Sequence, residues 1–115
     1  MPIEQVQSEL SALSTEEFRK LALSVVPQTV WLPVDEHHGG TLQWAKGWAH
    51  ARGFTTDDVR QAIVVMSPYT VRRLLQMEQE AAEVVYEALL LEGVRAGEVA
   101  TYAFREKRRA FREAI

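Results

Sequence analysis

Apolar residues recur at steps of three and four along almost the whole chain, the spacing that gathers them on one face of an α-helix. The first such face begins with Ile3, Val6 and Leu10, and a second follows with Phe18 and Leu21. This periodicity constrains the fold more than any other feature of the sequence. It predicts an all-α protein in which amphipathic helices share one core.

Start and stop signals divide this pattern into separate helices. Ser14 and Glu17 have the spacing of a capping box, and Pro27 ends the helix that follows because proline lacks the amide hydrogen of a helix interior. A third helix is expected to be capped by Thr41 and to close on Gly53. Two further helix starts are predicted, at Thr55-Thr56-Asp57-Asp58 and at Ser67-Pro68.

The helix that opens at Pro68 meets no stop signal before Gly93, so one long helix is predicted over residues 68–92. At about 1.5 Å per residue it would measure roughly 37 Å, which is more than the core of so small a domain requires. Its end is apolar nearly all round, through Leu89, Leu90 and Leu91. A last helix is expected from about residue 96 to residue 114.

Residues 30–34 are apolar and extended in character, but Pro33 makes a central strand improbable. A short irregular strand or a packed loop is expected there. The predicted fold is therefore a compact bundle of roughly five to six helices, with connections too short to separate domains. Residues 1–115 are expected to form a single helical domain.

The composition excludes several classes of site. The chain has 0 cysteines, which rules out disulfides, thiolate nucleophiles and cysteine-based zinc or iron–sulfur sites. No basic leader precedes an apolar run, and no apolar run approaches the ~20 residues of a membrane span. We therefore expect a cytoplasmic protein without membrane contact. The net charge of −3 argues against a general nucleic-acid coat protein, which displaces counterions with a cationic surface.

Basic residues gather near the C-terminus, where residues 102–115 contain five bases and two acids. A rotation of about 100° per residue places four arginines in one stripe of the last helix. They are Arg105, Arg108, Arg109 and Arg112. Two interpretations remain open. The stripe binds phosphates or an acidic partner, or it is a solvated face that nearby carboxylates neutralise. The carboxylates in question are Glu106, Glu113, Glu80, Glu83 and Glu87.

Residues 55–75 have the order helix, tight turn, helix. This segment is similar to the helix-turn-helix family, whose second helix enters the major groove of DNA. The resemblance implies that the early residues of the second helix contact bases and phosphates. They are Tyr69, Thr70, Arg72 and Arg73. The segment departs from the family pattern at Arg60, Gln61 and Val65, so two ordinary packed helices are the competing interpretation.

Other clusters favour structural roles. Trp44 and Trp48 lie four residues apart and are expected in the core, with Gly47 admitting a neighbouring helix. The His37-His38 segment is expected to be a polar loop, because adjacent histidines seldom bind one ion and no metal motif accompanies them. No serine has the surroundings of a catalytic nucleophile. No catalytic residue, metal or cofactor is predicted.

Two functions are compatible with this pattern, and neither is enzymatic. The first is a nucleic-acid-associated module that uses Arg72, Arg73 and the C-terminal arginines. The alternative is a protein-interaction or assembly subunit, in which the apolar end at residues 89–91 packs against another chain and gives a homodimer. Nucleic-acid affinity would fall steeply with salt, whereas an apolar interface would persist.

Overall fold

The structure is a computed structural model that describes residues 2–30 and 38–114. These residues form seven α-helices and one 3-10 helix, with no strand among them. In chain order the elements are α1 (Ile3–Ser11), α2 (Thr15–Ser24), η1 (Gln28–Val30), α3 (His38–Ala51), α4 (Thr56–Val65), α5 (Pro68–Leu75), α6 (Gln79–Arg95) and α7 (Thr101–Glu113). The all-α prediction is confirmed. Of the strand expected at residues 30–34, Val30 belongs to η1 and the rest lies outside the described residues.

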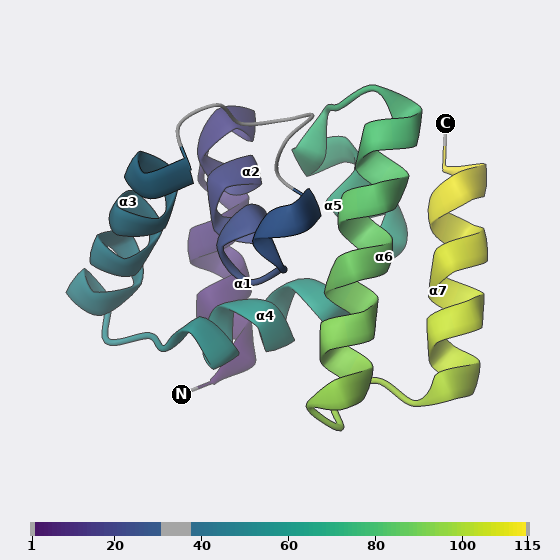
Figure 1. Cartoon of the computed structure of the whole chain (residues 1–115). Helices are drawn as coiled ribbons and strands as arrows, with labels where there is room; N and C mark the ends of the chain where they lie inside the picture. The colour runs from purple at the N-terminus through teal and green to yellow at the C-terminus, as the bar shows by residue number, and fades with distance from the viewer. Residues whose placement is uncertain (1, 31–37, 115) are drawn as a thin grey trace.

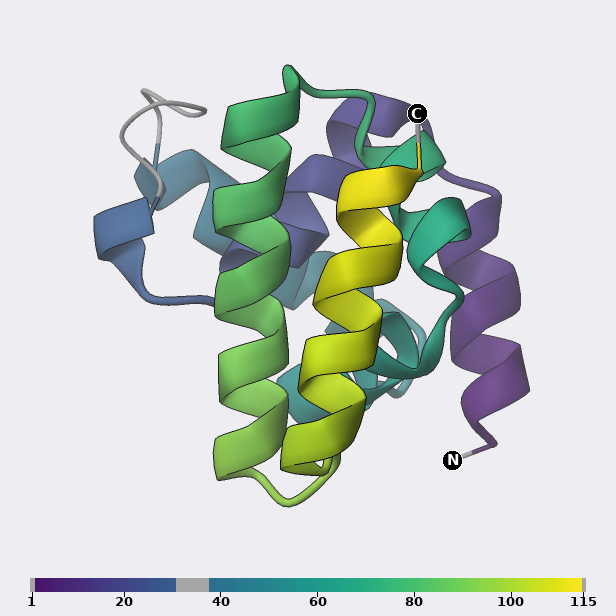
Figure 2. The ribbon, with the colours of Figure 1, turned by 90° about the vertical axis from the view of Figure 1, so that its right-hand side faces the viewer.

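The last two helices form an antiparallel hairpin that covers one side of the bundle (Figures 1 and 2). Helix α7 packs against α5 and α6, and α6 also packs against α4 and α2. Helix α2 is central, because it contacts α3, α4, α5 and α6. The core lies between the hairpin and the preceding helices. Its largest fully buried side chains include Phe18, Leu21, Ile63, Leu75, Tyr86, Leu89, Leu90 and Phe111.

The predicted capping signals at two helix starts are confirmed. The Ser14 hydroxyl accepts a hydrogen bond from the Glu17 amide, and the Glu17 carboxylate accepts from the Ser14 amide. Thr55 and Asp58 form the same reciprocal pair at the start of α4. Gly53, with φ 74°, follows the end of α3 as expected. Each of these signals depends on groups a few residues apart, so the local sequence is sufficient to determine it.

The predicted long helix over residues 68–92 is wrong, because residues 76–78 divide it into α5 and α6. This division raises the helix count above the predicted five to six. Gln76 adopts a left-handed conformation, with φ 42° and ψ 50°, although it is not a glycine. We refer to residues 76–78 as the α5–α6 break.

Two arginines donate hydrogen bonds to three carbonyl groups at the break. In a continuous helix, the carbonyls of residues 75, 76 and 77 would accept from amides four residues further along. Here Arg19 of α2 donates to the Leu75 and Gln76 carbonyls. Arg72 donates to the Met77 carbonyl at 2.9 Å. The break therefore depends on Arg19, which is 56 residues distant from Leu75 in the sequence.

Three other expected boundaries are also corrected. Helix α3 begins at residue 38, so Thr41 is buried inside it and is not its cap. Helix α6 continues through Gly93 to Arg95, and α7 begins at Thr101 and not near residue 96.

Gly93 allows close packing where a helix stop was expected. An added Cβ there would lie 2.9 Å from Val99 Cγ2 and 3.3 Å from Val64 Cγ1. Gly47, which was expected to admit a neighbouring helix, is exposed and has no atom within 4 Å of an added Cβ. The close approach of α6 to α4 is therefore made at Gly93.

Alanine substitutions at these two glycines are predicted to change stability in opposite directions. Gly47→Ala should raise the free energy of unfolding by about 0.5–1 kcal/mol, because alanine favours a helix interior and its methyl group meets no neighbour. Gly93→Ala should lower it by about 1–3 kcal/mol, because stiff valine side chains must shift. Urea denaturation followed by circular dichroism measures both changes. An equal gain for both variants would contradict the close packing at Gly93.

Candidate interaction surface

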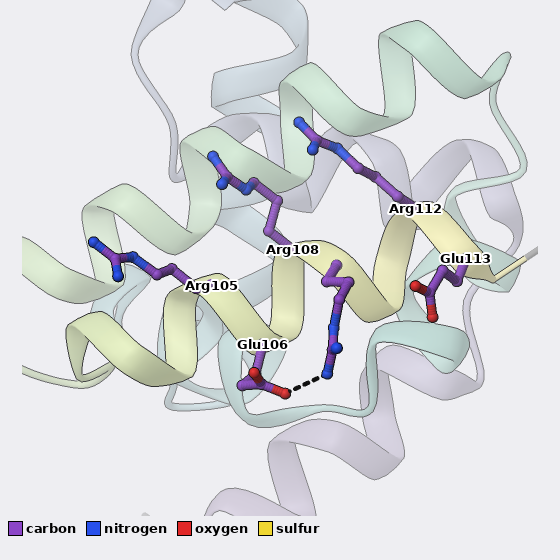
Figure 3. Close-up of a pocket in the computed structure, with 6 residues that line it drawn as sticks. Arg105, Glu106, Arg108, Arg112 and Glu113 are labelled. Carbon is purple, nitrogen blue, oxygen red and sulfur yellow. Dashed lines mark hydrogen bonds and ion pairs between the residues drawn. The ribbon is translucent and has the colours of Figure 1, made fainter.

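The C-terminal arginines line a hollow on the surface of α7. Arg105, Arg108 and Arg112 extend from the helix in a common direction, whereas Glu106 and Glu113 point elsewhere (Figure 3). Together with Arg109 these residues border a hollow of about 400 Å³. We refer to Arg105, Arg108, Arg109 and Arg112 as the arginine face.

Carboxylates already pair with three residues of the arginine face. Arg108 Nη1 lies 3.3 Å from Glu87 Oε1, and Arg112 Nε lies 3.9 Å from Glu83 Oε1. Both of these pairs connect α7 to α6, whereas Arg109 pairs with Glu106 within α7 at 2.6 Å. The side chains of all three pairs are partly exposed, and such pairs typically contribute only about 0–1 kcal/mol to stability. They are therefore weak enough to be rearranged by a partner.

Arg105 has no ion-pair or hydrogen-bond partner among the described residues. The helical register explains why. Glu83 and Glu87 stand four residues apart on α6, and the next position in that row is Leu91. Helices α6 and α7 run antiparallel (Figure 2). The pairs Arg112–Glu83 and Arg108–Glu87 set a register in which the next step along the row brings Leu91, which has no carboxylate, near the level of Arg105. A free guanidinium and an exposed leucine thus occur at the same level of the hairpin.

The predicted nucleic-acid contacts of α5 do not all reach the surface. Tyr69 is 60% exposed, and Arg73 is exposed without a partner in the described part of the chain. Thr70 is half-buried. Arg72 is also half-buried, donates to the Met77 carbonyl, and has its guanidinium carbon 5.7 Å from the centre of the Phe111 ring. Arg72 therefore takes part in the fold, while Tyr69 and Arg73 remain accessible.

Arg60 departs from the helix-turn-helix pattern because it belongs to an ion-pair network. Its Nε lies 3.2 Å from Glu98 Oε2, and its Nη1 lies 3.0 Å from Asp57 Oδ1. The hydrogen bonds that it donates to Glu98 are the main cause of the raised pKa of Arg60. This network fastens the turn between α6 and α7 to α4. The helix order expected for residues 55–75 is present, but Arg60 serves intramolecular packing there.

Only one of the three predicted interface leucines is accessible. Leu89 and Leu90 are both 0% exposed and lie in the core of the chain itself. Leu91 is 44% exposed. A partner that contacts this region in the described conformation therefore meets Leu91 and not its two neighbours.

Sequence reasoning missed two further accessible side chains on the hairpin, Val84 and Tyr102. In the described residues five large apolar side chains are exposed, and three of them lie on the hairpin: Val84, Leu91 and Tyr102. Val84 precedes Leu91 by seven residues, a spacing that places both on one side of α6. The seven-residue spacing could be read from the sequence. It did not show that this side of α6 is exposed, because that depends on which side packs against the core.

The inner side of the hairpin is held to the bundle by buried groups. The Tyr86 ring stacks on Phe111 with ring centres 4.2 Å apart. Its hydroxyl has no hydrogen-bond partner among the described residues, and burial raises the pKa of Tyr86 well above its usual value. Lys107 Nζ donates to the Met66 carbonyl at 3.4 Å, and burial lowers the pKa of Lys107.

The described part of the chain offers no candidate for a metal or membrane site. His37 lies outside the described residues. Residues 2–30 and 38–114 contain no group of three or more potential ligands for a metal ion. Over the same residues, no helix combines the length and apolar character needed to cross a membrane.

No protein-family model, curated protein or solved structure matches the chain. Its function is therefore inferred from the chemistry of its surface.

Tyr86→Phe is predicted to reduce the loss of stability in alkali. Because burial raises the folded-state pKa of Tyr86, the hydroxyl ionises more readily in the unfolded chain, and stability is lost as pH rises above about 10. Removing an unpaired hydroxyl should also raise the free energy of unfolding at pH 7 by about 1 kcal/mol. Urea denaturation between pH 7 and 11 measures both effects.

Tyr102→Phe, at a position that is 77% exposed, is the control and should behave as wild type. A loss of stability in Tyr86→Phe at pH 7 would show that the hydroxyl is satisfied.

Proposed function

We propose that this chain is a non-enzymatic protein-interaction module that pairs with a second copy of itself through the outer face of the α6–α7 hairpin. This outer face comprises Val84 and Leu91 of α6, Tyr102 of α7 and the arginine face. The observation that carries the proposal is the row of glutamates on α6 beside the row of arginines on α7, connected by two ion pairs.

The charge balance of the outer face favours a protein partner over a polyanion. Three of the four arginines of the arginine face already have a glutamate partner: Glu87, Glu106 and Glu83. These carboxylates would repel the phosphates of a nucleic acid. A protein surface with charges of both signs can pair with both rows.

The exposed apolar side chains supply the contacts that charge alone does not. Tyr102 is 77% exposed, Val84 is 47% exposed and Leu91 is 44% exposed. Tyrosine and arginine are among the residue types that contribute most often to the affinity of protein interfaces. Burying these three side chains would remove apolar surface from water while the exposed ion pairs form a polar rim.

The arrangement of the two rows favours a second copy as the partner. Helices α6 and α7 are antiparallel neighbours, with acids along one and bases along the other. A two-fold axis parallel to the helices and between two facing copies would place α6 of one copy over α7 of the other. Every glutamate of the row would then face arginines of both chains. The surface is therefore complementary to itself.

Leu91→Glu is predicted to weaken self-association by about tenfold or more, because an added charge must be buried at the apolar part of the interface. Sedimentation equilibrium over a range of protein concentrations measures the change. Val65→Glu is the matched control, since Val65 is 43% exposed, lies on α4 and is not part of the outer face. Both variants should keep the circular dichroism spectrum of the wild type. A monomeric wild type at all concentrations, or a Leu91→Glu variant that dimerises like wild type, would contradict the proposal.

Nucleic-acid binding is a second candidate, and accessible groups on α5 and α7 favour it. Tyr69, Arg73 and Arg105 are exposed, and neither arginine has a partner among the described residues. These groups are suited to base stacking and phosphate contacts.

If the chain binds nucleic acid, alanine substitutions on the arginine face should lower its affinity for DNA or RNA of every base sequence by a similar factor. Arg108→Ala combined with Arg112→Ala should also make the slope of log affinity against log salt shallower by about 0.7–0.9 for each phosphate that the variant no longer binds. Arg73→Ala would instead change which base sequences the protein prefers, because a side chain that contacts bases discriminates among them. Fluorescence anisotropy with labelled DNA and RNA at several salt concentrations measures these effects. The absence of binding by the wild type at low salt would exclude this function.

A further inference from the structure

We propose that the α5–α6 break is a hinge through which two copies of the chain exchange their α6–α7 hairpins, giving a domain-swapped dimer. In this dimer α5 and α6 form one continuous helix, and each hairpin packs on the core of the other copy. The exchange does not use the outer face, so it is independent of the pairing proposed above.

The local sequence of the break conflicts with its bend. The break consists of Gln76, Met77 and Glu78, all of which are good helix formers, and it contains no glycine or proline. Gln76 nevertheless adopts a left-handed conformation at φ 42°, which is unfavourable for a residue with a side chain. The preference of these residues is therefore a straight helix, and packing elsewhere imposes the bend.

The bent and straight forms satisfy the same three carbonyl groups. In the bent form, Arg19 donates to the carbonyls of residues 75 and 76, and Arg72 donates to that of residue 77. In the straight form, the amides of residues 79, 80 and 81 would donate to them. The two guanidinium groups would then be solvated. Both forms therefore provide donors for the carbonyls of residues 75, 76 and 77.

Only a second copy can cover the hairpin once the helix straightens. The inner side of the hairpin is apolar and has at most 2% exposure at five large side chains: Val85, Tyr86, Leu89, Leu90 and Phe111. A straight helix in a single chain would expose all of them to water. The matching surface exists on the α1–α5 part of another copy, which also provides Arg60 for Glu98 and the Met66 carbonyl for Lys107.

The close packing at Gly93 provides a direct test, because the chain has 0 cysteines of its own. An added Cβ at Gly93 lies 3.6 Å from Val64 Cβ, within the range for a disulfide. One full-length chain carries Val64→Cys and another carries Gly93→Cys. Both also carry Leu91→Glu, which removes pairing through the outer face. The two chains are unfolded together, refolded at high concentration and oxidised.

The expected product is a disulfide-linked heterodimer, because α6 of one chain then packs on α4 of the other. A single chain with both cysteines is the control for geometry, and it should form the disulfide within a monomer at low concentration. If this control forms its disulfide but the mixed chains give no linked heterodimer, the proposal is wrong.

Hinge variants test the proposal without a substitution at Gly93. In the Leu91→Glu background, Arg19→Met with Gln76→Ala should raise the dimer fraction after refolding by about tenfold. The bend loses the two hydrogen bonds from Arg19, and alanine favours the straight helix more than glutamine does. Gln76→Gly is the opposite variant, and it should remain monomeric. Light scattering coupled to size-exclusion chromatography gives the masses. Equal dimer fractions in the two variants would overturn the proposal, even if the cysteine chains fail to fold.

Discussion

The hydrogen bonds from Arg19 and Arg72 to the α5–α6 break determine how the second half of the chain meets the first. They allow the chain to turn after Leu75, so that α6 and α7 return across the core. Hydrogen bonds from charged donors contribute about 1.5–3 kcal/mol each, which offsets a left-handed residue that costs about 1–2 kcal/mol. Burying one large apolar side chain contributes roughly 1.5–3 kcal/mol, and the hairpin buries several. Hydrophobic burial therefore drives the return of the hairpin, and the arginines determine where the chain bends.

The same return creates the surface on which the functional proposals depend. It places the glutamates of α6 beside the arginines of α7 and converts a basic helix into a surface of nearly balanced charge. It also covers Leu89 and Leu90 while leaving Leu91 exposed. A stripe that suggests phosphate binding when the helix is viewed alone is thus partly paired with carboxylates of the neighbouring helix. The interpretation changes because charge complementarity is a property of two neighbouring helices and not of one.

The elements that were predictable from the sequence are those controlled by neighbouring residues. The capping boxes at Ser14 and Thr55 were predictable because the groups that bond are three residues apart. The buried sides of α1 and α2 were predictable too, since Val6, Leu10 and Phe18 follow the helical period and are buried. The α5–α6 break was not, because Gln-Met-Glu has no breaking residue and the donor that permits the break is on α2.

Backbone hydrogen bonding and periodic burial within single helices explain why the amino-acid sequence was enough to establish the all-α class, most helix starts and the buried side of each early helix. The bend at Gln76, the close approach at Gly93 and the partners of the arginine face required the packed fold. Each of these depends on groups that are distant in the chain, such as Arg19 with Leu75 and Arg108 with Glu87. Such pairs form only after hydrophobic burial has brought the helices together, so short-range patterns in the sequence do not predict them.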